Sequence, residues 1–219
     1  MKKEKESIKY KAIIFDLDGT LINSLPYHFI SIKKVLHKHG IYVSVIYLMR
    51  IIGLATKIIF KDFKKKYKLK ESVEDLINER RAYYYGAIKN RSMTFPGVER
   101  IINELGKRYK LAIATGSSKE TLLHSTKMDF RKMFDVIITI NDTKRGKPYP
   151  DPFLLAVKKL KVKLSEFLVI GDSIYDGKAA KRAKIDFIGV ETGFTSPGEL
   201  RKTGAICVIK SIKELGKML

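Results

Sequence analysis

The sequence has very little cysteine and no long apolar run. Cys207 is the only cysteine among 219 residues, so the chain cannot form an intramolecular disulfide. It also has no ligand-spaced Cys or His partner for a zinc-ribbon site, and we interpret it as a small buried apolar side chain. No stretch of about 18 apolar residues is present, and the basic N-terminus lacks the apolar region of a signal peptide. These absences argue against a membrane span and a secreted disulfide-rich domain, and we expect a cytoplasmic protein.

Acidic residues are also scarce. The chain has 44 Lys and Arg against 23 Asp and Glu, a formal net charge of +21. Such a field attracts nucleic acid, acidic membrane surfaces and anionic metabolites. The positive charges are spread along the whole chain, and aromatic residues are not interleaved with them as they are in base-stacking surfaces. We expect a small phosphorylated metabolite as the partner, no membrane and no nucleic acid, and the chain as either a monomer or a homodimer.

Short apolar runs alternate with segments of helical period in the second half of the chain. Uniformly apolar runs of this length are typical of buried parallel strands. The predicted strands are residues 10–15, 111–114, 136–139, 167–170 and 187–190, and the predicted helices are 98–109, 118–130, 152–161 and 176–184. This alternation predicts an α/β fold with a doubly wound, Rossmann-like parallel sheet.

One interval interrupts that alternation. Residues 25–92 contain helical patterns without a comparable strand, and Phe95-Pro96-Gly97 marks the return to the alternating pattern. We expect an inserted α-helical cap domain at 25–92 and a core domain formed by 1–24 and 93–219. One cap helix is predicted to be amphipathic with a basic stripe. That stripe comprises Lys57, Lys61, Lys64, Lys65 and Lys68.

The motif Asp16-Leu17-Asp18-Gly19-Thr20 follows the first predicted strand. Open α/β sheets bind ligands at the carboxyl ends of their strands, so both carboxylates are expected in one pocket. Two ionised carboxylates repel each other, so the pair implies a bound cation or a raised pKa. Taken alone, the motif also suits a pair of carboxylates that caps a turn.

Three more polar clusters follow successive predicted strands. Thr115 and Gly116 begin a loop that is able to bind phosphate oxygens, Lys147 lies in a proline-stiffened loop, and Asp172 and Asp176 add two carboxylates. Each cluster also has a purely structural interpretation, as a helix cap or a solvated lysine. Four such clusters at successive strand ends favour one shared site for phosphate and Mg²⁺.

This ordered set resembles the haloacid dehalogenase superfamily, in its subgroup with a helical cap that contains phosphoglycolate-phosphatase-like and β-phosphoglucomutase-like enzymes. The resemblance implies a Mg²⁺-dependent phosphatase that hydrolyses a small phosphate monoester of the phosphoglycolate or sugar-phosphate type. It also implies that Asp16 is the nucleophile that forms an aspartyl-phosphate. Asp18 would then be the acid that protonates the leaving oxygen and the base that activates water.

The same resemblance implies the remaining site residues. Asp16, the backbone carbonyl of Asp18, and Asp172 would hold Mg²⁺, with Asp176 completing or supporting that set. Thr115, Gly116 and Lys147 would bind the phosphoryl group, and Lys147 would pair with Asp16.

Two assignments keep alternatives open. Gly171-Asp172 stands where the mutase-like branch has Glu-Asp, which favours a phosphatase, whereas Pro26-Tyr27-His28 resembles the hinge of that mutase-like branch. His28 is therefore a possible substrate-site residue, and it also suits a satisfied helix position. Lys57 lies in a segment that resembles the substrate-specificity loop of the family, although an exposed surface lysine is the simpler explanation.

A different class of function also deserves a test. The basic cap stripe suits a protein that binds nucleic acid or an acidic partner on a degenerate hydrolase scaffold. Such a protein is expected to have lost at least one catalytic group. This chain retains them all, which favours an enzyme.

Overall fold

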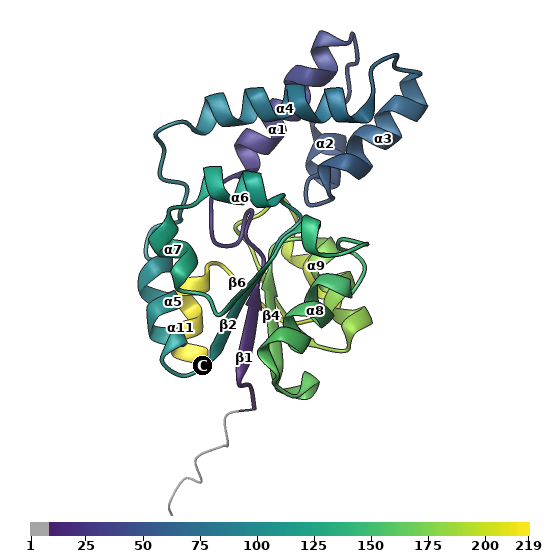
Figure 1. The fold of residues 1–219 in the computed structure, drawn as a ribbon. Helices are drawn as coiled ribbons and strands as arrows, with labels where there is room; N and C mark the ends of the chain where they lie inside the picture. Colours follow the sequence, from purple (N-terminus) through teal and green to yellow (C-terminus); the bar gives the residue numbers. More distant parts are fainter. Residues whose placement is uncertain (1–8) are drawn as a thin grey trace, which may run out of the picture.

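The computed structural model describes residues 9–219, apart from the side chain of Met128. Residues 1–8 of the predicted first core segment lie outside the described residues. A parallel sheet with helices on both faces forms the lower part of the molecule, and four helices lie above the carboxyl ends of its strands (Figure 1). The predicted α/β class with a helical cap is therefore confirmed.

Six parallel strands form the sheet, in the order β3-β2-β1-β4-β5-β6. In this order β1 lies between β2 and β4, and Phe15 on β1 is level with Ile113 and Ile170. The residues that follow these three strands therefore emerge side by side at one edge. The strands are β1 (Ala12–Phe15), β2 (Lys110–Ala114), β3 (Val136–Ile138), β4 (Phe167–Gly171), β5 (Asp186–Val190) and β6 (Ala205–Ile209).

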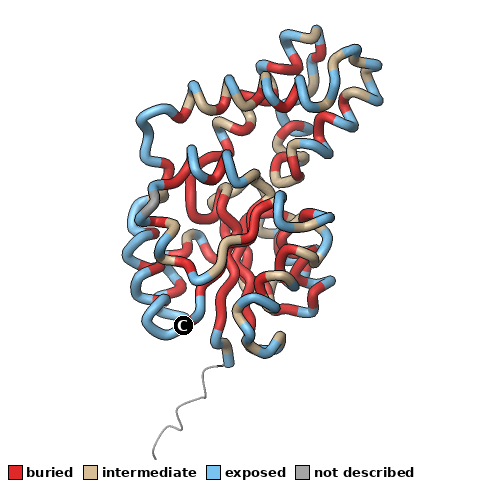
Figure 2. The backbone as a smooth tube through the Cα atoms, viewed as in Figure 1, coloured by how far each residue is buried: buried red, intermediate tan, exposed pale blue. Residues whose placement is uncertain are grey.

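Alternate residues of each strand enter two separate apolar layers. Ile13 and Phe15 pack with α5 on one face, and Ala12 and Ile14 pack with α8 and α9 on the other. Figure 2 shows the buried strands between helices with exposed outer faces. The core helices are α5 (Val98–Gly106), α6 (Lys119–Ser125), α7 (Met128–Lys132), α8 (Asp151–Leu160), α9 (Ile174–Ala183), α10 (Pro197–Lys202) and α11 (Leu215–Met218), with 3₁₀ turns η1 (Ile140–Asp142), η2 (Leu164–Glu166) and η3 (Ile212–Glu214).

The cap has its own apolar cluster, in which Val35, Phe60 and Leu76 from three helices meet. Its helices are α1 (Leu25–Lys38), α2 (Val45–Ile51), α3 (Thr56–Tyr67) and α4 (Val73–Ile88). The Lys64 ammonium donates to the carbonyls of Leu69 and Glu71 after α3, so one lysine of the basic stripe holds the cap's own backbone. The boundaries at 24/25 and 92/93 stay predictions.

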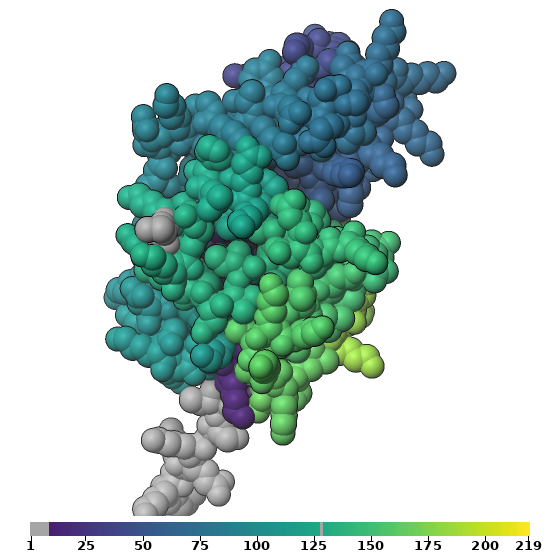
Figure 3. All heavy atoms as spheres, in the orientation of Figure 1, coloured from purple at the N-terminus to yellow at the C-terminus, as the bar shows by residue number. Residues whose placement is uncertain are grey.

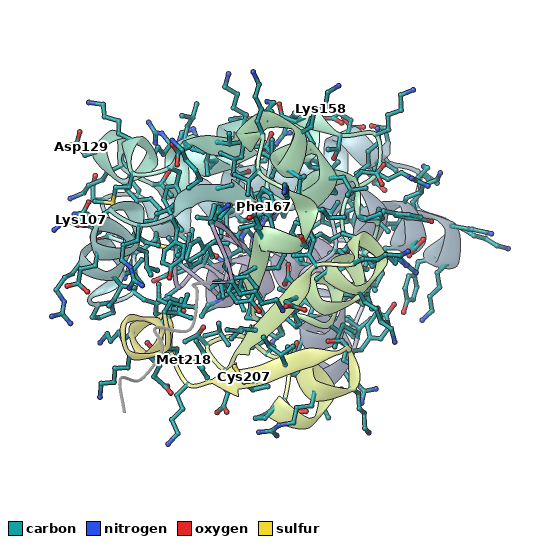
Figure 4. The ribbon with its side chains drawn as sticks, turned by 90° about the horizontal axis from the view of Figure 1, so that it is seen from below. Lys107, Asp129, Lys158, Phe167, Cys207 and Met218 are labelled. Atoms are coloured by element: carbon teal, nitrogen blue, oxygen red, sulfur yellow. The ribbon has the colours of Figure 1, made fainter. Side chains whose placement is uncertain are left out.

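Three local expectations were wrong. β6 was not predicted, although Ala205–Ile209 is a uniformly apolar run whose residues are mostly half-buried at the sheet edge. Residues 118–130 form two helices rather than one, since Thr126 and Lys127 adopt extended backbone between α6 and α7. Cys207 on β6 is half-buried rather than buried, and Figure 4 shows it on this edge strand.

The lysine-rich surface surrounds the core rather than gathering on one element. In Figure 4 Lys107 and Lys158 point outward at the periphery, while Phe167 lies among the packed helices. None of the helices within residues 9–219 is both long enough and apolar enough to cross a bilayer.

Candidate active site

Polar side chains from three strand ends and one loop meet beneath the cap. Asp16 follows β1, Thr115 follows β2 and Asp172 follows β4, while Lys147 comes from the loop between η1 and α8. All four are buried. The parallel register explains this meeting, since β1 pairs with both β2 and β4 and their carboxyl ends are level.

A cluster of carboxylates occupies the centre of the site. One oxygen each from Asp16, Asp172 and Asp176 lies within 4.8 Å of the others. The Lys147 Nζ donates to Asp16 Oδ1 at 2.5 Å and to Asp176 Oδ1 at 2.6 Å. Two carboxylates that the sequence analysis assigned to separate motifs are thus joined by one buried ammonium group.

Burial and mutual repulsion shift the pKa values of this cluster. Burial, opposed by Lys147 and reinforced by the charge of Asp176, raises the pKa of Asp16 to about 7. Burial and the charge of Asp16 raise the pKa of Asp172 well above its usual value. Burial acts to lower the pKa of Lys147, but the charges of Asp16 and Asp176 outweigh it and raise that pKa. Lys147 therefore stays charged, but its single positive charge does not balance the three carboxylates of the cluster.

The donor set fits a hard divalent cation. Three carboxylates face one ammonium group, so two negative charges are left over when all are ionised. Within the described chain no hydrogen bond reaches Oδ2 of Asp16 or Oδ2 of Asp172, while Oδ1 of Asp172 accepts from the Thr20 hydroxyl at 2.8 Å. Carboxylate oxygens of this kind are the ligands that Mg²⁺ takes.

Asp176 has a structural role as well. Its Oδ2 accepts from the backbone amide and hydroxyl of Ser173, the N-cap of α9, in a capping box. Its Oδ1 accepts from Lys147. The capping interpretation is therefore correct for Asp176, and the same carboxylate also anchors Lys147.

Asp18 lies in a different environment from Asp16. Its Oδ1 accepts from the Ser24 hydroxyl at 2.7 Å and contacts His28 Nε2 at 2.9 Å. Its Oδ2 accepts from the hydroxyls of Thr115 at 3.0 Å and Ser117 at 2.8 Å. Burial acts to raise the pKa of Asp18, but His28 and the hydroxyls of Ser24 and Ser117 outweigh it and lower that pKa. Asp18 is thus held as a carboxylate with fixed orientation.

His28 links the core to the cap. Its ring stacks on Tyr84 of α4 with centroids 4.5 Å apart, and its Nδ1 contacts the guanidinium of Arg80. Burial and the Arg80 charge lower the pKa of His28, which favours the neutral ring. Because Arg80 can only donate, Nδ1 acts as acceptor and the proton is assigned to Nε2, which donates to Asp18.

A narrow pocket of about 50 Å³ lies over this site, and Asp16, Asp18 and Lys147 line it. A cleft of about 570 Å³ adjoins it between the cap and the core, which lie against each other in Figure 3. The predicted Gly116 lines both spaces, whereas Lys57 is exposed on α3 and lines only the cleft. The Thr115 hydroxyl bonds Asp18 and accepts from the Ser117 amide.

Sequence reasoning missed several residues of this site. The hydroxyls of Thr20, Ser24 and Ser117 hold the carboxylates. Thr20 stands inside the motif that begins at Asp16, and Ser117 directly follows the predicted Thr115 and Gly116. Arg80 was missed as well, although Leu76, Tyr84 and Ile88 flank it at four-residue steps on the buried face of α4. A charged residue within an apolar helical stripe is a signal that was available.

Comparisons with known proteins identify the family of this chain. The family model described as haloacid dehalogenase-like hydrolase matches residues 13–190. A phosphorylated carbohydrates phosphatase of Thermotoga maritima is 29% identical over 206 residues, which cover 91% of this chain and 94% of that protein. The pyrophosphatase PpaX of Bacillus cereus is 32% identical over 178 residues, or 77% of each chain.

Solved structures show the same architecture across nearly the whole chain. A hydrolase from Pseudomonas syringae superposes with a TM-score of 0.84 at 29% identity, covering 95% of this chain and 97% of that one. A β-phosphoglucomutase from Clostridium difficile gives a TM-score of 0.79 at 26% identity, with 94% and 93% covered. From the family match over residues 13–190 and these relatives, we conclude that the chain belongs to the haloacid dehalogenase-like hydrolases.

Proposed function

We propose that this chain is a Mg²⁺-dependent phosphatase that hydrolyses a small phosphate monoester through an aspartyl-phosphate at Asp16. The observation that carries this proposal is the contrast between Asp16 and Asp18. One carboxylate faces an ammonium group within an acidic cluster, and its neighbour two residues on accepts hydrogen bonds from hydroxyls and His28. Two carboxylates with separated environments suit two different chemical roles. Relatives described as phosphatases support the reaction class.

Asp16 is the nucleophile in this proposal. A carboxylate oxygen of Asp16 attacks phosphorus, and the bond from phosphorus to the leaving oxygen breaks. Lys147 orients Asp16 and offsets the charge on the phosphoryl oxygens together with the loop at Thr115 and Gly116. Asp16, Asp172 and the backbone carbonyl of Asp18 would hold Mg²⁺, which would supply further positive charge against carboxylate and phosphate. Asp176, already bonded through both oxygens, supports this set.

Asp18 moves the protons. It gives a proton to the leaving oxygen, and as a carboxylate it then takes one from the water that attacks the phosphorus of the intermediate and releases Asp16. The low pKa of Asp18 suits the second step. A phosphate dianion bound beside it raises that pKa and so favours the protonated form needed in the first step. The Nε2 proton of His28 holds Asp18 Oδ1 in place throughout.

The test is turnover of an aryl phosphate, p-nitrophenyl phosphate, with and without Mg²⁺. Asp16→Asn is expected to abolish hydrolysis, and a circular dichroism spectrum unchanged from wild type would show an intact fold. Asp135→Asn is the matched control, because Asp135 lies at the opposite end of the sheet before β3 and its side chain, among the described residues, bonds only Lys110 and the Leu111 amide. Undiminished turnover by Asp16→Asn would refute the proposal.

A mutase is the second candidate, and the contact between His28 Nε2 and Asp18 favours it because this histidine resembles the hinge of the mutase-like branch. The two activities give different products. A phosphatase releases inorganic phosphate from a hexose 1-phosphate, whereas a mutase converts that ester into the 6-phosphate without net release. Phosphate release in step with substrate loss is the expected result.

A further inference from the structure

The Asp172 carboxylate is packed against two glycines from different loops. Gly19 lies in the loop after β1, and Gly193 lies in the loop between β5 and α10. A Cβ on Gly193 would collide with Oδ2 of Asp172 and lie 2.6 Å from its Cγ. A Cβ on Gly19 would lie 2.6 Å from the same Oδ2. Bare backbone from both loops therefore encloses this carboxylate, and a larger residue at either position would displace it.

Space alone requires glycine at position 193. Gly19 has a φ of 91°, which side chains rarely adopt, so its backbone conformation already calls for glycine. Gly193 does not have a positive φ, so its backbone is open to alanine. The group that excludes a methyl there is the Asp172 carboxylate. A substitution of Gly193 therefore reports on this contact rather than on backbone strain.

Hydrogen bonds hold this enclosure together. The Thr192 hydroxyl donates to the carbonyl of Gly19 at 2.6 Å, which ties the two loops to each other. The Thr20 hydroxyl donates to Oδ1 of Asp172 at 2.8 Å. One carboxylate oxygen is held by a hydrogen bond and the other is packed against glycine backbone, so the carboxylate has little room to turn. We call Gly19, Thr192 and Gly193 the Asp172 cradle.

The cap supports the cradle from outside. Leu25 at the start of α1 lies against Gly19, because a Cβ there would be 2.7 Å from Leu25 Cδ1. Phe194, the residue after Gly193, packs against the apolar cluster of the cap. Both side chains also line the pocket over Asp172. Neither loop of the cradle can move away from the carboxylate without disturbing the packing of the cap.

A fixed carboxylate matters most when it binds a cation. Oxygens of Asp16, Asp172 and Asp176 lie within 4.8 Å of one another, and Mg²⁺ demands nearly ideal octahedral geometry. A ligand that turns freely has to be ordered when the cation binds, which costs affinity. Within residues 9–219 no hydrogen bond reaches Oδ2 of Asp172, so the cradle restrains this oxygen without competing for it.

We propose that Gly193 is a positioning residue for the metal site. Its backbone, together with the rest of the cradle, holds the Asp172 carboxylate in the orientation in which it meets Asp16 and Asp176. Gly193 acts through Asp172 and contacts none of the reacting groups. This inference rests on the Mg²⁺ site of the proposed function. A methyl group at position 193 should displace Asp172 and weaken Mg²⁺ binding.

Calorimetric titration of the substrate-free protein with MgCl₂ measures this effect without turnover. We expect Gly193→Ala to raise the Kd for Mg²⁺ by at least about tenfold. Thr192→Val keeps the side-chain shape but removes the bond to the Gly19 carbonyl, and should raise the Kd about three- to tenfold. Gly198→Ala and Thr143→Val are the controls and should keep the wild-type Kd. A Cβ on Gly198 meets nothing within 4 Å, and the Thr143 hydroxyl has no hydrogen-bond partner among the described residues.

A stability comparison identifies the group that position 193 contacts. In metal-free buffer Gly193→Ala should lower the urea midpoint, because the added methyl overpacks the carboxylate. In an Asp172→Ala background the same change should leave the midpoint unchanged, since the methyl then enters the space left by the carboxylate. An equal fall in both backgrounds would show that Gly193 packs against another group and would contradict the cradle.

The two levels of inference fail in different ways. The Mg²⁺ concentration that gives half-maximal turnover of p-nitrophenyl phosphate should rise by the same factor as the Kd. Absence of Mg²⁺ binding by the wild-type protein would overturn the proposed metal dependence together with this role of Gly193. A wild-type Kd that both Gly193→Ala and Thr192→Val leave unchanged would overturn the role of Gly193 alone. Thr192→Val decides the question by itself if Gly193→Ala does not fold.

Discussion

The Nζ of Lys147 lies 2.5 Å from Oδ1 of Asp16, although 131 positions separate the two residues. Both side chains are buried. Asp16 follows β1, and Lys147 reaches it from the loop that precedes α8. The pair joins the proposed nucleophile to the charge that stabilises it, and it also neutralises one member of a crowded acidic cluster.

Removing the ammonium group of Lys147 should lower the stability of the metal-free protein. In Lys147→Met the carboxylates of Asp16 and Asp176 lose their only shared cation, and we expect the free energy of unfolding in metal-free buffer to fall by about 3–5 kcal/mol. Urea denaturation with EDTA present measures this. The control is Lys110→Met, because the Lys110–Asp135 pair has side chains 61% and 38% exposed and should contribute under about 1 kcal/mol. Equal losses in the two variants would contradict the buried-pair argument.

The acidic cluster should make stability depend on pH and metal. Folded Asp16 keeps its proton up to about pH 7, against an ordinary value of 3.8, so between these values the folded protein binds more protons than the unfolded chain. The free energy of unfolding should therefore fall by a few kcal/mol as the pH rises from about 4 to about 7. Asp16→Asn should reduce this slope.

Mg²⁺ should reverse this loss of stability at higher pH, because it binds the ionised carboxylates that otherwise repel one another. We expect millimolar MgCl₂ to raise the Tm more at pH 8 than at pH 5, measured by differential scanning fluorimetry. NaCl at the same ionic strength controls for screening. A Tm gain that is equal at both pH values would argue against a metal bound by Asp16 and Asp172.

The sequence was sufficient for the sheet core and for the residues that meet at its edge. β1 and β4 are uniformly apolar and buried on both faces, so composition reveals them directly. β6 is uniformly apolar as well, although it lies at the sheet edge with Ile206 exposed and Cys207 half-buried, so the sequence signal for this strand was available. The break at Thr126 between α6 and α7 was not visible in the sequence, since apolar spacing continues across it.

Site residues that belong to a sequence motif could be predicted. Residues that only the packing of the cap brings to the site could not. Asp16, Lys147 and Asp172 each follow a strand whose position the sequence indicates. Arg80 reaches the site only because α4 packs across the strand ends. Sequence gives the face of α4 on which Arg80 lies, but not which element that face meets.

Asp18 should matter more for poor leaving groups than for good ones. Asp18→Asn keeps the size of the side chain but cannot supply a proton, so hydrolysis of an alkyl phosphate such as glycerol 3-phosphate should fall by about 10²–10⁴-fold. p-Nitrophenol leaves without protonation, so hydrolysis of the aryl phosphate should fall less than that of the alkyl phosphate. Its rate should then be limited by the attack of water on the aspartyl-phosphate. Burst kinetics with p-nitrophenyl phosphate check this, because the aspartyl-phosphate should accumulate. Identical losses for both esters, without a burst, would assign Asp18 another role.

Two helical glycines should respond in opposite directions to alanine. A Cβ at Gly177 on α9 would collide with the Thr203 hydroxyl and lie 2.9 Å from a ring carbon of Phe187, so Gly177→Ala should lower the free energy of unfolding by about 1–3 kcal/mol. A Cβ at Gly86 on α4 meets nothing within 4 Å, so Gly86→Ala should raise it by about 0.5–1 kcal/mol through lower chain entropy in the unfolded state. Urea denaturation of both variants in one buffer measures the difference. Because neither residue lines the pocket or the cleft, kcat/KM should follow the folded fraction alone, and destabilisation by Gly86→Ala would show that α4 needs its flexibility there.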